Sequence, residues 1–91
     1  MIKLSGQLIC KTLEESESVR RFLPEHILLT INEPGCVAFE VKETADPLVW
    51  TVEELFADQK SFEAHQERTK KSSWGVETGS IQRQYEIQEV S

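Results

Sequence analysis

The chain has 91 residues and a mass of 10.5 kDa, which allows one domain and leaves no room for a second hydrophobic core. Sixteen acidic residues against ten basic ones give a net charge of −6. Such an acidic surface repels the phosphates of nucleic acids and of anionic membranes. We therefore expect a single domain over residues 1–91, with its core at about 2–87, and neither a nucleic-acid nor a membrane partner.

The N-terminus alternates apolar and polar residues, and it lacks the basic stretch and long apolar run of a signal peptide. No apolar run in the chain is long enough to span a bilayer. These features predict a cytoplasmic protein. In that reducing compartment, Cys10 and Cys36 are expected to remain free thiols that behave as small buried hydrophobic residues.

A strand followed by a helix is predicted at the start of the chain. Residues 2–10 alternate with period two around Gly6, where we expect a bulge or a close approach of another segment. Thr12 and Glu15 fit a capping box, in which side chains satisfy the free backbone N–H groups at a helix start. An apolar stripe with helical spacing follows, made of Val19, Phe22, Leu23, Ile27 and Ile31. Pro24 predicts a kink or a restart within that helix.

The rest of the chain predicts a second strand at residues 36–42, a third strand at 48–56 and a second helix at 59–71. A loop at 72–80 and a fourth strand at 81–87 follow. Asn32 is expected to cap the first helix at its end, and Asp58 to cap the second helix at its start. The alternation in the second strand places Val37, Phe39 and Val41 on one face. Residues 88–91 are expected to be a frayed tail.

The resulting order, β-α-β-β-α-β, is typical of the ferredoxin-like α+β fold, a four-stranded antiparallel sheet with both helices on one face. The other face of the sheet is then uncovered and exposes apolar residues such as Val49 and Leu55. A chain this short is marginally stable alone. We therefore expect a homodimer in which a second copy packs against this sheet face.

Three segments resemble the antibiotic biosynthesis monooxygenase superfamily: EPGCVAFEV at residues 33–41, VEELFADQKSFEAH at 52–65 and QYEI at 84–87. The resemblance implies a dimeric α/β barrel of ferredoxin-like protomers, with a cleft between the sheet and the helices of each protomer. It also implies a choice of activities. Members include cofactor-independent monooxygenases acting on quinols and phenols, heme-degrading enzymes and an isomerase of a phosphorylated sugar.

The sequence departs from the heme-degrading branch, which uses an Asn, Trp and His set. Phe56 stands where that branch carries Trp, and the first strand offers Ser5 or Gln7 in place of Asn. The chain also has no glycine-rich phosphate loop, and its two His and two Cys lack metal-ligand spacing. We therefore expect no cofactor and no metal.

His65 is the first catalytic candidate. It follows Phe62 by three residues on the inward stripe of the predicted second helix, and the resemblance places it at the cleft. An imidazole there is suited to act as a general base; a structural histidine, satisfied by a carboxylate or a carbonyl, is the alternative. Glu54 lies on an apolar strand face. Two roles are open for it: a buried ion pair, for example with Arg83 or Arg20, or a catalytic role in which it orients His65.

The substrate-binding candidates are aromatic residues suited to a planar ligand, which would otherwise belong to the core: Phe39, Trp50, Phe56 and Tyr85. Trp74, in the predicted loop, is expected either to cover the cleft or to plug the end of the barrel. Arg83 is a candidate for holding an anionic substrate, or else for a surface ion pair. His26, beside Glu25, is expected on the helix surface.

Together these observations and the resemblance predict a cofactor-independent monooxygenase that oxidises a small quinol or phenolic compound with O₂. His65 would be the base and Glu54 would position it. The alternative is an isomerase or a protein that binds a small metabolite, on the same fold. An isomerase would not require O₂, which distinguishes the two.

Overall fold

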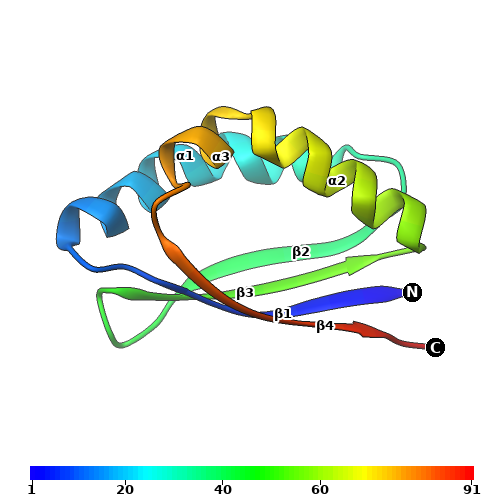
Figure 1. Ribbon diagram of the computed structural model, residues 1–91, viewed down its shortest axis with the longest axis horizontal. Coiled ribbons are helices and arrows are strands. Elements are labelled where there is room, and N and C mark those ends of the chain that lie inside the picture. Colours follow the sequence, from blue (N-terminus) through cyan, green and yellow to red (C-terminus); the bar gives the residue numbers. More distant parts are fainter.

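The computed structural model describes all of residues 1–91 and has two layers, with the helices lying over one face of a four-stranded sheet (Figure 1). All neighbouring strands are antiparallel, in the order β2-β3-β1-β4. The predicted α+β ferredoxin-like fold is confirmed, with one additional short helix. The elements are β1 (Ile2–Ile9), α1 (Leu13–Ile31), β2 (Cys36–Glu43), β3 (Val49–Phe56), α2 (Gln59–Lys71), α3 (Ser73–Glu77) and β4 (Gln82–Glu89).

The hydrophobic core lies between the sheet and the helices. On β1, the alternation predicted from the sequence points Leu4 and Leu8 inward, where both are almost completely buried. Their partners across β3 are Glu54 and Trp50, so the carboxyl group of Glu54 belongs to the same inward row as the core side chains. Val19 and Leu23 of α1 complete the contact from the helix layer. The core thus surrounds one buried acidic residue.

The capping of α1 follows the predicted pattern. Thr12 Oγ1 accepts a hydrogen bond from the backbone N–H of Glu15 at 3.1 Å, and Glu15 Oε1 accepts one from the N–H of Lys11 at 2.7 Å. The carboxylate therefore reaches one residue further back than in the usual capping box. Pro24 lies inside a helix of 19 residues that neither ends nor restarts there. Asn32 is the predicted C-cap, and its Nδ2 donates to the carbonyl of Leu28 at 2.7 Å.

Two predictions for the C-terminal part are wrong. Residues 72–80 are not simply a loop, because Ser72 Oγ accepts from the N–H of Gly75 at 3.1 Å and starts the short helix α3. The tail is not frayed either, because β4 continues to Glu89 beside β1. Met1 and Val90 then exchange two hydrogen bonds of 2.8 Å, from the N–H of Val90 to the carbonyl of Met1 and from the amino terminus to the carbonyl of Val90.

The uncovered face of the sheet is less apolar than predicted. Val49 and Leu55 are half-buried even without a partner chain. The side chains beside them on this outer face are mostly polar: Lys3, Ser5 and Gln7 of β1, and Gln82, Gln84, Glu86 and Gln88 of β4. The β2–β3 pairing is irregular between Cys36 and Ala38, which leaves Val37 55% exposed instead of beside Phe39 and Val41.

None of the three helices has both the length and the apolar character that a membrane-spanning helix needs.

Gly6 provides a test of the β1–β4 pairing. A Cβ atom at this position would lie 2.0 Å from the carbonyl oxygen of Gln84 and 2.7 Å from Cδ1 of Tyr85, so β4 must move to admit a side chain. We expect Gly6→Ala to lower the free energy of unfolding by about 1–3 kcal/mol in urea titrations. Glu25→Ala, at an exposed position of α1, should stay within about 0.5 kcal/mol of wild type. Equal stability of the two variants would contradict this close approach.

Candidate functional site

A cavity of about 270 Å³ lies between the sheet and the helices, where the resemblance implies a cleft. Both layers contribute to its wall: the three helices α1, α2 and α3, and the strands β2, β3 and β4. The lining residues are His26, Phe39, Val41, Val52, Glu54, His65, Gln66, Thr69, Trp74, Arg83 and Tyr85.

His65 is held in the cavity wall by the start of α2 and by a carboxylate from another segment. Asp58 Oδ1 accepts from the N–H of Ser61 at 2.8 Å and fixes the start of the helix, whose inward face then carries Phe62 and His65. His65 is 2% exposed, and its Nδ1 lies 2.7 Å from Oε1 of Glu33. A carboxylate only accepts hydrogen bonds, so Nδ1 carries the proton and Nε2 keeps its lone pair.

Glu33 is itself fixed by Arg68. Its second oxygen, Oε2, accepts a hydrogen bond from Nε of Arg68, whose Nη2 also donates to Thr30 Oγ1 at 3.1 Å. The carboxylate therefore bridges an arginine and a histidine on the same helix, while it belongs to the turn between α1 and β2. This arrangement fixes both the orientation and the tautomer of the imidazole.

The second ring nitrogen of His65 makes only long contacts. Nε2 lies 3.4 Å from Thr69 Oγ1 and 3.5 Å from Glu54 Oε1. Burial lowers the pKa of His65 below its ordinary value, and the hydrogen bond that Nδ1 donates to Glu33 opposes that shift only in part. The imidazole is thus neutral near pH 7, and its basic nitrogen, Nε2, makes no protein contact shorter than 3.4 Å.

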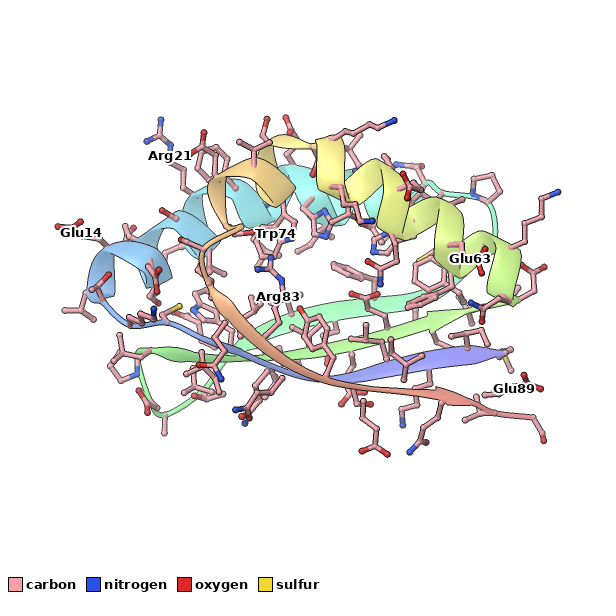
Figure 2. All side chains as sticks on the ribbon, in the orientation of Figure 1. Glu14, Arg21, Glu63, Trp74, Arg83 and Glu89 are labelled. Carbon is pink, nitrogen blue, oxygen red and sulfur yellow. The ribbon has the colours of Figure 1, made fainter.

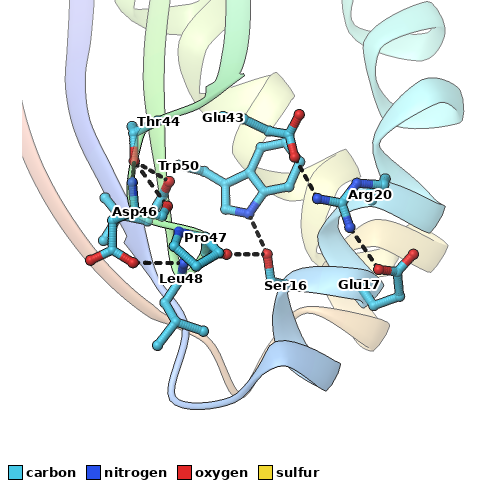
Figure 3. Close-up of polar contacts among 10 residues, drawn as sticks. Ser16, Glu17, Arg20, Glu43, Thr44, Asp46, Pro47, Leu48 and Trp50 are labelled. Carbon is cyan, nitrogen blue, oxygen red and sulfur yellow. Dashed lines mark hydrogen bonds and ion pairs between the residues drawn. The ribbon is translucent and has the colours of Figure 1, made fainter.

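Glu54 is a buried acid close to this nitrogen. It is 7% exposed, and its Oε1 has no hydrogen-bond partner. Burial, reinforced by repulsion from Glu33 and opposed by Arg83, raises the pKa of Glu54 to about 7. The alternative of a buried ion pair is not observed, because Arg20 binds Glu17 and Glu43 at the surface (Figure 3) and Arg83 makes no ion pair.

Arg83 extends from β4 toward α3, where Figure 2 shows it below Trp74. Its guanidinium donates to the carbonyl and the hydroxyl of Thr78, both at 2.8 Å, and to the carbonyl of Ile81 at 3.0 Å. These bonds tie the end of α3 to the start of β4. The arginine therefore lines the cavity with much of its donor capacity already used.

The structure places four of the six predicted substrate-binding residues on the cavity: Phe39, Trp74, Tyr85 and Arg83. Trp50 is not among them, because it is buried near the start of α1, where its Nε1 donates to Ser16 Oγ at 3.0 Å (Figure 3). Phe56 lies behind His65, at 4.8 Å between ring centroids, and supports that imidazole without lining the cavity.

Sequence reasoning missed two residues of the site. His26 is 3% exposed and lines the cavity, so the expectation of a surface histidine is wrong. The buried side of α1 carries Val19, Leu23, His26 and Thr30, whereas Ile31 of the predicted stripe is 52% exposed. That buried set has regular helical spacing and was a usable signal. Glu33 lay within a recognised motif, but no feature of the sequence showed its contact with His65.

No three His, Cys, Asp or Glu side chains form a cluster that could hold a metal ion. Cys10 is buried and Cys36 is half-buried, as free thiols, and burial raises the pKa of both.

The chain resembles known proteins in both sequence and fold. The family model described as antibiotic biosynthesis monooxygenase matches residues 14–71, well over half of the chain. No curated protein sequence gives a match.

Solved structures share the fold at low sequence identity. A candidate antibiotic biosynthesis monooxygenase from Nitrosomonas europaea superposes with a TM-score of 0.77 at 19% identity, over 99% of this chain and 98% of that one. A similar protein from Deinococcus radiodurans gives 0.77 at 15% identity, over 100% and 93% of the two chains. A conserved protein from Methanosarcina mazei gives 0.75 at 18%, over 99% and 92%. At these identities the likeness concerns the fold.

The raised pKa of Glu54 predicts a pH-dependent cost to stability. The folded-state pKa of about 7 exceeds the ordinary value of 4.5, so the folded protein retains a proton that the unfolded chain releases. The contribution of Glu54 is therefore intact below pH 4.5 and is lost as the pH rises to about 7. Across that range, the free energy of unfolding of Glu54→Gln should rise relative to wild type by about 3 kcal/mol.

Urea unfolding of both proteins at a series of pH values measures this difference. Curves that stay parallel from acid to neutral pH would show that Glu54 titrates normally in the folded protein.

Proposed function

The chain belongs to the antibiotic biosynthesis monooxygenase family, and on that premise we propose that it is a monooxygenase that oxidises a small quinol or phenol with O₂, without a bound cofactor. The observation that carries the proposal is the neutral imidazole of His65 in the cavity wall, whose Nδ1 is bonded to Glu33 and whose Nε2 lies beside two other cavity-lining residues, Thr69 and Glu54.

In the proposed reaction, His65 is the general base. A substrate hydroxyl donates its proton to Nε2, and the imidazolium that forms is stabilised by the carboxylate of Glu33 on the opposite nitrogen. The resulting phenolate is electron-rich enough to reduce O₂. Glu33 is here the positioning residue for the base, the role that sequence reasoning gave to Glu54.

The reaction balances without an external reductant. A quinol plus O₂ gives a hydroxyquinone plus water, so one oxygen atom enters the ring and the other leaves as water. The substrate supplies all the electrons. The proposed role of Glu54, whose pKa is raised to about 7, is to exchange a proton with Nε2, which lies 3.5 Å from its Oε1.

The cavity favours a small substrate. Its volume of about 270 Å³ is slightly below the range of about 300–1,000 Å³ typical of small-molecule sites. Phe39, Trp74 and Tyr85 present aromatic surfaces on its wall, which suit a planar ring. We propose a substrate with a single aromatic ring.

A non-oxidative isomerase is the second candidate. The observation that favours it is the short separation, 3.5 Å, between two groups that can each carry a proton, His65 Nε2 and Glu54 Oε1. Such a pair can move a proton between adjacent carbons of a carbonyl compound. Turnover that persists when O₂ is removed would select this function over the oxidative one.

We expect wild-type protein to consume O₂ with at least one member of a panel of one-ring quinols, measured with an oxygen electrode. His65→Asn should lower the rate by about 10²–10⁴-fold, because the general base is removed. Glu63→Gln, on the exposed side of the same helix (Figure 2), is the matched control and should leave the rate unchanged. If His65→Asn retains the wild-type rate, or if wild type is inert with every quinol, the proposal fails.

We further propose that the protein is a homodimer formed through the outer face of the sheet. The half-buried Leu55 borders a hollow of about 540 Å³ on this face, together with Lys3 and Ala38 of the adjacent strands. An apolar side chain at the surface and a hollow beside it both fit a surface that a second copy of the chain covers.

Sedimentation equilibrium should give twice the chain mass of 10.5 kDa. Leu55→Glu should shift the protein to monomer, because it places a charge in the proposed contact. Leu28→Glu makes the same change at a leucine of the helix layer that is 60% exposed, and it should leave the mass unchanged. A monomeric wild type would overturn the proposed dimer.

A further inference from the structure

His26 is a second buried imidazole on the cavity, and the proposed reaction does not use it. Its ring stacks on Trp74 with 4.7 Å between centroids and an angle of 2° between the planes. Phe39 meets it edge-on, at 5.2 Å and 84°. Held between two aromatic rings, this imidazole has little freedom to turn toward a new partner.

The protein leaves a ring nitrogen of His26 without a hydrogen bond. Nδ1 is buried and has no hydrogen-bond partner. Burial, aided by His65, Arg68 and Arg83, lowers the pKa of His26 to about 3. The ring is therefore neutral and presents one N–H donor and one lone pair.

An apolar residue at position 26 would fill the same stack without leaving a buried nitrogen unpaired. Buried polar groups in folded proteins are nearly always hydrogen-bonded, so an exception calls for an explanation such as an absent ligand. Glu54 Oε1 is a second unpaired atom among the residues that line this cavity. Nδ1 of His26 is enclosed by the protein, so the nitrogen of this cavity-lining ring that can receive a polar atom from outside the chain is Nε2.

We propose that His26 is a specificity-determining residue that hydrogen-bonds a second hydroxyl on the ligand, so that the cavity selects a dihydroxylated ring over a monohydroxylated one. The inference rests on the proposed function in one respect, namely that a first hydroxyl is bound by His65. The two imidazole centroids are 5.8 Å apart, close enough for a one-ring ligand to contact both. A hydroxyl both donates and accepts, so it satisfies either tautomer of His26.

The test measures binding without turnover, by NMR titration of the protein with hydroquinone and with phenol in the absence of O₂. The two tryptophans provide an internal comparison, since the indole signal of Trp74 should move on binding while that of Trp50, away from the cavity, should not. We expect wild type to bind hydroquinone about tenfold more tightly than phenol, the effect of one added hydrogen bond.

His26→Phe keeps an aromatic ring in the stack and removes both nitrogens. It should bind phenol as wild type does and lose the preference for hydroquinone. Arg21→Gln, an exposed change on the same helix (Figure 2), is the control and should keep the preference. A hydroquinone preference that survives in His26→Phe would overturn the inference.

A measurement on wild type covers the case in which His26→Phe fails to fold. The ring ¹⁵N signals of His26 should shift on addition of hydroquinone and not of phenol; equal responses would overturn the inference. Wild type that binds both ligands equally would remove the role of His26 and leave the proposed function standing. Wild type that binds neither would remove both.

Discussion

The carboxylate of Glu33 is the constraint on which the site depends. It lies in the turn after α1, yet it bonds Arg68 and His65, which are on α2. This half-buried group thereby joins the turn after α1 to α2 and fixes the proton of His65 on Nδ1. Without this bond the imidazole would be free to present either nitrogen to a ligand. The unprotonated Nε2 in the cavity wall is therefore a consequence of the contact between this turn and α2.

The fold was largely predictable because its signals are local. Period-two alternation, the caps at Thr12 and Asp58 and the order of the elements each depend on residues close together in the sequence. The errors arose where local and tertiary preferences compete. Ser72 starts a helix within a stretch rich in turn-forming residues, and the irregularity in β2 turns Val37 outward. Neither feature is visible in the spacing of apolar residues along the sequence, which is the signal used to predict the elements.

The site was only partly predictable, for a related reason. His65 could be placed on the cavity, because its spacing from Phe62 is a property of one helix. The bond between Glu33 and His65 joins residues 32 positions apart and depends on how α2 packs. This contact also changes the role predicted for Glu54. The short hydrogen bond to His65 comes from Glu33, and Glu54 lies 3.5 Å from Nε2 without bonding the ring. The unpaired buried atoms of His26 and Glu54 lower the free energy of unfolding, because each has lost its hydrogen bonds to water without gaining one in the protein.

The most direct test of this account is the tautomer of His65, read from the ¹⁵N chemical shifts of the two histidine rings by NMR at neutral pH. The account predicts a neutral ring with its proton on Nδ1 and an unprotonated Nε2. A ring protonated on Nε2, or on both nitrogens, would leave no basic atom facing the cavity and would contradict the proposed chemistry.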